Sequence, residues 1–223
     1  MTMSTENGVG GLPVHIHGFA LMHVAMRRDA RRIATAAPNV TRANAGPVRT
    51  WFDQLRDVIE WHHRTEDDVL FPALRDRVAD FAAKEKELAH DHTELDQSMA
   101  DVSTALRGDL GAVPEAARKF ETILLDHLAV EEPIVFPVFV DDLTRQQYLD
   151  IENQVMRSAG PGMRAFLFPW LFDGVDKRTA DAAAAVSIPP PVRLIGNTVL
   201  TWRYERLLAP IRRLGEPGAT NEG

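Results

Sequence analysis

The stretch HHRTEDDVLFP, residues 62–72, decides the fold, because a matching stretch, HLAVEEPIVFP, residues 127–137, follows 65 positions later (127 − 62). In both copies a histidine precedes a glutamate by four residues, and a Phe-Pro pair comes five residues after that glutamate. Residues four apart lie one above the other on an α-helix. Each copy therefore presents an imidazole and a carboxylate from adjacent turns, a pair that one metal ion can bridge, and the duplication argues against coincidence.

Apolar residues recur at helical spacing in four segments of the N-terminal part of the chain. The segments are 18–35, 51–70, 81–106 and a fourth that begins at Pro114. Helical periodicity interrupted by short loops rich in Gly, Pro and Asn is typical of an antiparallel four-helix bundle. We therefore expect an all-α protein with this bundle over residues 15–142. Residues 1–14 are small, polar and Gly-rich, which predicts a flexible tail.

The composition changes after residue 143, and we interpret 143–223 as a helical C-terminal extension that packs on the bundle. Thr144 and Gln147 have the spacing of a capping box and predict a helix to about residue 158. An apolar stretch at 166–172, an Ala-rich segment at 179–187 and a last helix at 192–213 follow. The apolar stretch suits packing against the bundle, or alternatively the surface of a homodimer.

Composition excludes several classes of function. The net charge of −7 and the isoelectric point near 5.6 argue against a nucleic-acid groove. The chain has no cysteine, which removes disulfides, thiolate metal sites and covalent haem attachment. No signal peptide and no apolar run of membrane-spanning length are apparent, so we expect a cytoplasmic protein that makes no membrane contact.

Polar residues interrupt the apolar stripe of every bundle helix, and they are the candidate metal ligands. Each helix aims one histidine at the bundle axis, and the second and fourth helices add a glutamate; the six residues are His23, His62, Glu66, His92, His127 and Glu131. Burying two carboxylates costs several kcal/mol each unless positive charge compensates. Divalent cations supply that charge and accept neutral imidazoles as ligands.

The other histidines and a group of arginines fit the stripe less well. His63 aligns with Leu128 in the repeat, which suggests half-buried packing around the site, and His90 is expected to point away from the stripe. We expect His15 and His17, before the first helix, at the surface or around the site. Four arginines of the first helix predict a solvated face that pairs with acidic neighbours: Arg27, Arg28, Arg31 and Arg32.

A histidine on the first helix, two HxxxE…FP motifs and a third-helix histidine resemble the hemerythrin-like (HHE cation-binding) family over about residues 15–142. The resemblance implies that the six candidate residues hold two non-haem iron ions joined by an oxo or hydroxo bridge, with Glu66 and Glu131 as bridging carboxylates. It also implies a small ligand (O2, NO or peroxide), for sensing or detoxification, with peroxide decomposition as a conceivable activity. The spacing does not distinguish iron from manganese or zinc.

The chain departs from the oxygen-carrying members of that family. They have a second third-helix histidine one turn from the first, and the corresponding residues here are Leu88 and Asp96. Four histidines and two bridging glutamates fill eight of the twelve positions of two six-coordinate ions, and an oxygen bridge fills two more. The remaining two positions are open unless Asp96 or water fills them, which favours peroxide, nitric oxide or oxygen chemistry, or sensing, over reversible oxygen transport.

The sequence leaves two alternative functions open. One is a ferritin-like carboxylate di-iron oxidase, for which Glu60-x-x-His63 and Glu87-x-x-His90 have the required spacing. The other is a regulatory or interaction module in which the metal is a sensor or a structural clamp and 143–223 provides the output.

Overall fold

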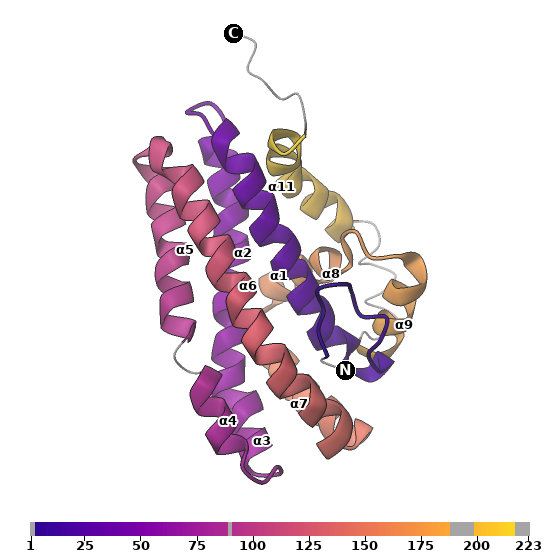
Figure 1. Cartoon of the computed structure of the whole chain (residues 1–223). Coiled ribbons are helices and arrows are strands. Elements are labelled where there is room, and N and C mark those ends of the chain that lie inside the picture. The colour runs from indigo at the N-terminus through magenta and orange to yellow at the C-terminus, as the bar shows by residue number, and fades with distance from the viewer. Residues whose placement is uncertain (1–2, 89–90, 188–198, 217–223) are drawn as a thin grey trace.

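The chain forms a bundle of four principal helices, seen side by side in Figure 1, in a computed structural model that describes residues 3–88, 91–187 and 199–216. The bundle helices are α1 (His17–Ala36), α2 (Ala45–Thr65), α5 (Asp91–Arg107) and α6 (Val113–Pro137). Helix α6 packs against α1 and α5, and α2 packs against α1 and α5. The described residues form helices and turns but no strand, which confirms the predicted fold class.

The third helix differs from the sequence-based prediction of one segment over 81–106. Two helices occupy this region, α4 (Phe81–Leu88) and α5, and residues 89–90 lie outside the described part of the chain. The short α3 (Phe71–Arg75) precedes α4 at one end of the bundle (Figure 1).

The two HxxxE…FP copies end in different ways. After α2 the chain passes through a π-helical turn, Glu66–Leu70, and the next helix then begins at Phe71 with Pro72 in its first turn. Helix α6 instead continues through Pro137, and its π-helical turn, Val138–Asp142, follows that proline. Proline lacks the N–H that an α-helical ladder needs, and π-turns are common near functional sites. The prolines therefore do not act at equivalent places, although the sequence repeat predicts that they would.

Two apolar clusters fill the bundle, and the HxxxE residues lie between them along each helix. Trp51, Phe52 and Phe120 are fully buried in one cluster. Phe71 and Phe136 are buried in the other, which also contacts α7 and the N-terminal residues. Because both clusters exclude water, the layer of polar side chains between them lies in a dry environment.

The extension covers the α1 side of the bundle (Figure 1). It comprises α7 (Arg145–Ser158), α8 (Pro161–Phe172), α9 (Lys177–Ser187) and α11 (Thr201–Leu214); residues 188–198 lie outside the described part. Thr144 and Gln147 form the predicted capping box at the start of α7. Of the last predicted helix, 192–213, the structure describes α11; positions 192–198 lie outside the described residues.

Polar contacts hold the extension to α1. Asp29 of α1 is fully buried and accepts a hydrogen bond of 2.7 Å from the indole N–H of Trp170 in α8. Arg28 donates to Asp29 and to the backbone oxygen of Asp173, and the hydroxyl of Tyr204 in α11 donates to Asp173 at 2.9 Å. The apolar stretch at 166–172 therefore packs mainly inward.

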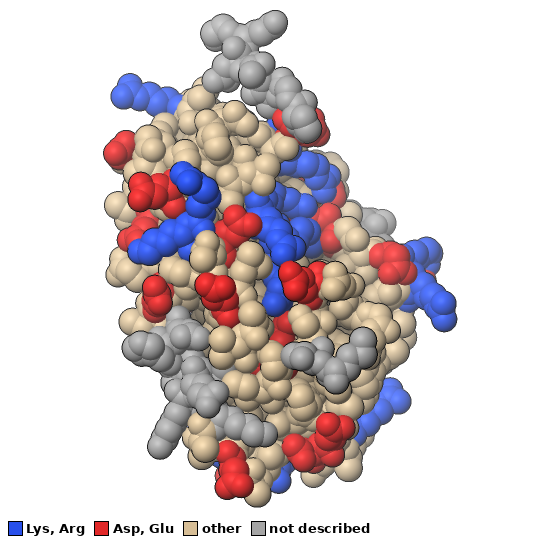
Figure 2. Space-filling model, in the orientation of Figure 1, with Lys and Arg blue, Asp and Glu red and all other residues tan. Residues whose placement is uncertain are grey.

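Surface charges are mixed on the face in Figure 2, where basic and acidic side chains alternate over the bundle. No helix of the described residues combines the length and the apolar character needed to cross a bilayer.

Candidate metal centre

The bundle brings the six sequence-predicted ligands together in its interior. All six are buried, with exposed fractions between 0 and 8%. Helix α1 supplies His23, α5 supplies His92, and the repeated motifs of α2 and α6, with the π-turn after α2, supply the other four. Each lies on the inner face because it occupies a core-facing position of its helix.

The first group consists of His23, His62, Glu66 and Glu131, and one potential ligand atom of each lies within 4.8 Å of all the others. Nε2 of His62 lies 3.0 Å from Oε1 of Glu66, and Nε2 of His23 lies 3.7 Å from Oε2 of Glu131. Two imidazoles and two carboxylates at these separations form a donor set that suits iron, manganese or zinc.

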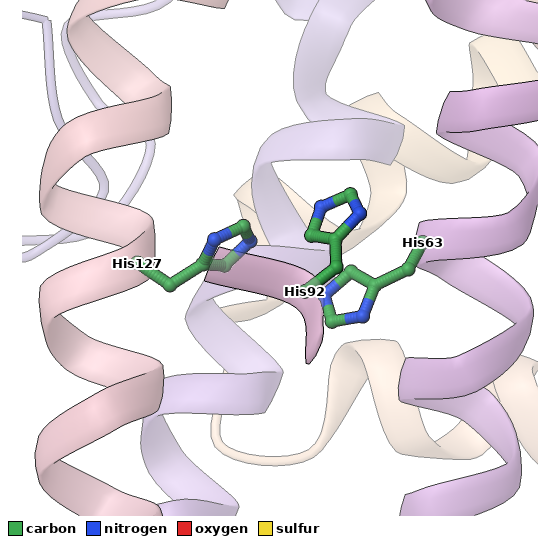
Figure 3. A group of neighbouring side chains, drawn as sticks. All are labelled: His63, His92 and His127. Carbon is green, nitrogen blue, oxygen red and sulfur yellow. The ribbon is translucent and has the colours of Figure 1, made fainter. Parts of the chain in front are cut away.

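The second group consists of His63, His92 and His127, and their ring nitrogens also lie within 4.8 Å of one another. Figure 3 shows the three rings converging in the space between the helices that carry them. The ring centroids of His63 and His92 are 4.3 Å apart, and that of His127 lies 5.1 Å from His63 and 5.2 Å from His92. Three convergent imidazoles are a common metal-binding arrangement.

The two glutamates link the two groups. Glu66 faces His62 of the first group with Oε1 and His92 of the second with Oε2, at 3.8 Å. Oε2 of Glu131 lies 3.3 Å from Nε2 of His127 in the second group. Each carboxylate therefore stands between a histidine of one group and a histidine of the other, which is where a carboxylate bridging two ions must lie.

His63 is the residue that sequence reasoning underestimated. It is 4% exposed and belongs to the second group, whereas its alignment with Leu128 predicts only half-buried packing around the site. Adjacent residues on a helix diverge by about 100°, so His62 can face α1 while His63 faces α5. The signal available in the sequence was the His-His pair itself, one turn before Glu66.

Unpaired polar atoms show that the donor set fits a bound cation. Both oxygens of Glu66, both ring nitrogens of His63 and the Nε2 atoms of His23, His62 and His92 are buried and make no hydrogen bond within the described part of the chain. Buried polar groups of a folded protein are almost always satisfied. A cation that accepts these lone pairs would provide the missing partner.

Burial favours the neutral form of three of the imidazoles, those of His62, His63 and His92. Burial, opposed by Glu131 and aided by His127, lowers the pKa of His62 to about 4. Burial and the neighbouring His92 and His127 hold the pKa of His63 well below its usual value. Burial and the neighbouring His127 also lower the pKa of His92. Neutral imidazoles offer the lone pairs that a metal needs near pH 7.

The pKa values of the two shared carboxylates, Glu66 and Glu131, are shifted in opposite directions. Burial, reinforced by the charge of Glu131, raises the pKa of Glu66 well above its ordinary value. Burial would also raise the pKa of Glu131, but the facing imidazoles of His23 and His127 outweigh it and lower that pKa. Without a cation, the pair therefore holds one proton and one negative charge.

A third carboxylate, that of Glu132, orients the ring of His23. Oε1 of the fully buried Glu132 lies 3.0 Å from Nδ1 of His23, so the Nε2 atom of the same ring points toward Glu131. Arg27 donates to both oxygens of Glu132, at 2.6 and 3.2 Å. Burial raises the pKa of Glu132, but hydrogen bonds from His23 and Thr5 and the charge of Arg27 lower it to about 2.

These contacts correct the expectation for Arg27 and change the picture of the N-terminus. Arg27 is 5% exposed rather than solvated, because it neutralises Glu132. In the segment predicted as a flexible tail, two groups donate hydrogen bonds to Glu132. They are the backbone N–H of Thr5, at 2.9 Å, and the hydroxyl of Ser4, at 3.0 Å. Thr5 and Val9 are buried. Residues 3–13 therefore pack on the bundle and close this side of the centre.

Other candidates lie away from the two groups. Asp96 is exposed and belongs to neither group of potential ligands. Glu60 pairs with Arg56 at 3.2 Å and is about half exposed, so the ferritin-like Glu60-x-x-His63 pair is not formed. His17 lies 2.9 Å from the carbonyl oxygen of Leu12. His90 and the side chains of Glu87 and Leu88 lie outside the described residues.

Fold and site together define a helical-bundle protein with a buried His/Glu centre built to hold cations. The profile of the hemerythrin HHE cation binding domain matches residues 14–139, more than half of the chain. The chain belongs to this family, which confirms the resemblance seen in the sequence.

Two plant proteins show distant similarity. Over 164 residues the chain is 27% identical to the zinc finger protein BRUTUS of Arabidopsis thaliana and 24% identical to a BRUTUS-like zinc finger protein of the same plant. The aligned regions cover 70% and 69% of this chain but 13% of each relative. The chain thus corresponds to a small part of those proteins. No solved structure matches it significantly.

Proposed function

We propose that the chain is a non-haem di-iron protein that binds a small ligand, O2, NO or hydrogen peroxide, at the His/Glu centre. The observation that carries the proposal is the pair of buried histidine groups that share Glu66 and Glu131. One ion would be held by His23 and His62, and the other by His63, His92 and His127. The two carboxylates would bind both ions.

The donor count supports a site with room for a ligand. Five histidines and two shared carboxylates supply nine of the twelve positions of two six-coordinate ions. An oxo or hydroxo bridge would fill two more, which leaves about one position for water or a ligand. His63 therefore adds a donor that the count from sequence omitted. When bound, two iron ions supply one-electron steps and Lewis acidity toward oxygen or peroxide.

The protein side chains contribute orientation and exclusion of water. Glu132 fixes the ring of His23, and Arg27 and Thr5 fix Glu132. Apolar clusters on both sides keep solvent from the centre. Outer groups that orient a ligand histidine commonly change metal affinity by about 10–100-fold.

Metal analysis of purified protein tests the proposal. We expect about two metal ions per chain, and a large loss of metal in the double variant His62→Ala/His127→Ala, which removes one histidine from each group. His15→Ala is the matched control, because His15 lies outside both groups. Unchanged metal content in the double variant would contradict the proposal.

The ligand is tested by optical spectroscopy of the iron-loaded chain. Addition of O2, nitric oxide or hydrogen peroxide should change near-ultraviolet and visible bands of the iron centre, and the His62→Ala/His127→Ala variant should lack these bands. A spectrum that none of the three ligands alters would refute ligand binding while leaving metal binding intact.

A regulatory or interaction module is the second candidate, favoured by an extension that adjoins the centre. Leu167 and Phe172 of α8 line the same cavity as His62 and Glu66. Size-exclusion chromatography with and without iron distinguishes the candidates. A change of assembly state on metal or ligand binding, including homodimer formation through the extension, supports the module.

A further inference from the structure

A cavity of about 100 Å³ lies between the bundle and the extension and reaches the metal centre. From the bundle, Phe19, Met22 and Trp61 form its wall, together with His62 and Glu66 of the first metal group. The facing wall comes from α7, α8 and α9 of the extension. The family profile matches residues 14–139, and the helices of the facing wall follow that region. The cavity therefore joins the candidate metal ligands to a part of the chain that the profile does not match.

The extension contributes both apolar and polar groups to this wall. Ile151, Leu167 and Ala183 are buried there, with exposed fractions between 1 and 5%. Glu152 of α7 also lines the cavity and accepts a hydrogen bond of 3.2 Å from the hydroxyl of Ser187 in α9. The carboxyl of Glu152, with the hydroxyl-bearing Tyr148 and Ser187 that also line the cavity, makes up the polar part of a mostly apolar wall on the side of the extension.

Helix α1 leaves room for that carboxyl. A Cβ atom at Gly18 would lie 2.0 Å from Oε1 of Glu152, which is far inside van der Waals contact. Glycine at this position lets the Glu152 side chain lie directly against the α1 backbone. The carboxyl is thereby held at the boundary between α1 and the extension, and burial raises its pKa to about 7, against the opposing hydrogen bond from Ser187.

Size and charge limit what the cavity can take. A diatomic molecule, about as large as a water molecule of about 30 Å³, would leave most of the space empty, whereas on the order of six to eight non-hydrogen atoms would fill it. Among the described residues that line it, none is a lysine or arginine that could neutralise an anion. An anion would therefore be buried without a partner, at a large cost that an uncharged ligand avoids.

We propose that this cavity binds a small uncharged organic molecule with an apolar body and one hydrogen-bonding end, and places it beside the metal centre. The apolar body contacts the aromatic and aliphatic walls, and the hydrogen-bonding end meets Glu152. Binding depends only on the cavity, whereas the position relative to a metal ion rests on the proposed function.

Cyclohexanol is a suitable probe, because it has a six-carbon ring, one hydroxyl and no charge. With seven non-hydrogen atoms it should bind with a dissociation constant of about a millimolar. Ligand-observed NMR on the full chain, at measured metal content, reports this binding. myo-Inositol has the same ring with six hydroxyls and should not bind, since the apolar wall cannot satisfy them. Equal binding of both probes would overturn the proposal.

A cavity-filling variant locates the site. Ala183→Leu adds bulk at a buried position that lines the cavity, and should weaken cyclohexanol binding at least about tenfold. Ala185→Leu makes the same change two residues away, at an exposed position of α9 that does not line the cavity, and should leave binding within about twofold. If Ala183→Leu disturbs folding, Leu171→Phe fills the same cavity from α8. Unchanged binding in a folded cavity-filling variant would refute the site.

The anchor role of Glu152 has its own test. Glu152→Leu should weaken cyclohexanol binding about fivefold, because a hydrogen bond of this kind contributes on the order of 1 kcal/mol. The same substitution should not weaken the binding of benzene, because benzene has no hydroxyl that could hydrogen-bond to Glu152. Equal losses for the two probes would show that Glu152 acts only by shape.

Paramagnetic relaxation tests the position beside the metal. Cyclohexanol protons should relax faster with protein loaded with Mn²⁺ than with Zn²⁺, since only Mn²⁺ is paramagnetic. A chain that holds neither metal but still binds cyclohexanol would contradict the proposed function alone. A chain that holds both metals but binds no cyclohexanol would contradict this inference alone.

Discussion

Nδ1 of His23 lies 3.0 Å from Oε1 of Glu132, and this contact directs the other ring nitrogen of His23 toward the candidate metal centre. Further groups of the chain hold Glu132, among them the guanidinium of Arg27, the backbone N–H of Thr5 and the hydroxyl of Ser4. The N-terminal residues are thus connected to the centre through a single carboxylate.

Replacing this carboxylate should weaken metal binding. Glu132→Gln keeps the shape but offers His23 a single oxygen and removes the charge that Arg27 neutralises. We expect metal affinity to fall about 10–100-fold, measured by competition with a chromophoric chelator. Glu115→Gln, at an exposed position in the first turn of the same helix, is the control and should have no effect. An unchanged affinity in Glu132→Gln would show that His23 needs no such support.

Metal binding should release about one proton per chain near pH 7, and Glu66 should be its source. Burial and the charge of Glu131 raise the pKa of Glu66, which favours a protonated carboxyl before metal binds, whereas the imidazole of His62, with a pKa of about 4, has no proton to lose. Metal affinity should therefore rise with pH until Glu66 ionises. Titration calorimetry with Zn²⁺ in buffers of different ionisation enthalpy measures the release. Glu66→Gln should abolish it, and a release of several protons would contradict the assignment.

Stability should fall as pH rises from about 4.5 to about 7 because of Glu152. The pKa of Glu152 is about 7 in the folded chain, whereas the ordinary value of a glutamate, 4.5, applies to the unfolded chain. Between these two pH values the folded state therefore binds more protons than the unfolded state. The shift corresponds to about 2 kcal/mol after allowance for partial exposure. Glu152→Gln should remove this part of the pH dependence, seen as the difference between the two proteins in urea unfolding at pH 4.5 and 8. Parallel pH profiles would contradict the prediction.

Asp29 should be essential for docking of the extension. Asp29→Asn removes the buried charge that faces Arg28 and Arg32 and weakens the acceptor of the Trp170 indole. Breaking a buried ion pair from one side typically costs about 3–5 kcal/mol, and we expect a loss of this order in the free energy of unfolding. Asp126→Asn, at an exposed position of α6, should change stability by less than about 0.5 kcal/mol. A loss no larger than that of the control would show that other contacts hold the extension.

Much of the bundle and of the centre could be predicted from local pattern. The four-residue spacing of His62 and Glu66 places both on one face of a helix, and its repetition at His127 and Glu131 identifies two equivalent helices. The capping box at Thr144 marks the start of α7 correctly, because it is a local hydrogen-bond pattern. Local signals did not separate α4 from α5, since the apolar spacing continues across 89–90.

The sequence by itself determined the helical class, the family and the set of polar residues that interrupt the apolar stripes, because helical periodicity and motif spacing are properties of consecutive residues. Tertiary structure decided which neighbour each residue faces. His63 joins His92 because α5 packs beside α2, Arg27 is buried because Glu132 faces it from α6, and the cavity at Glu152 exists because the extension lies over α1. Such contacts join residues far apart in the chain, so no spacing along a single helix encodes them.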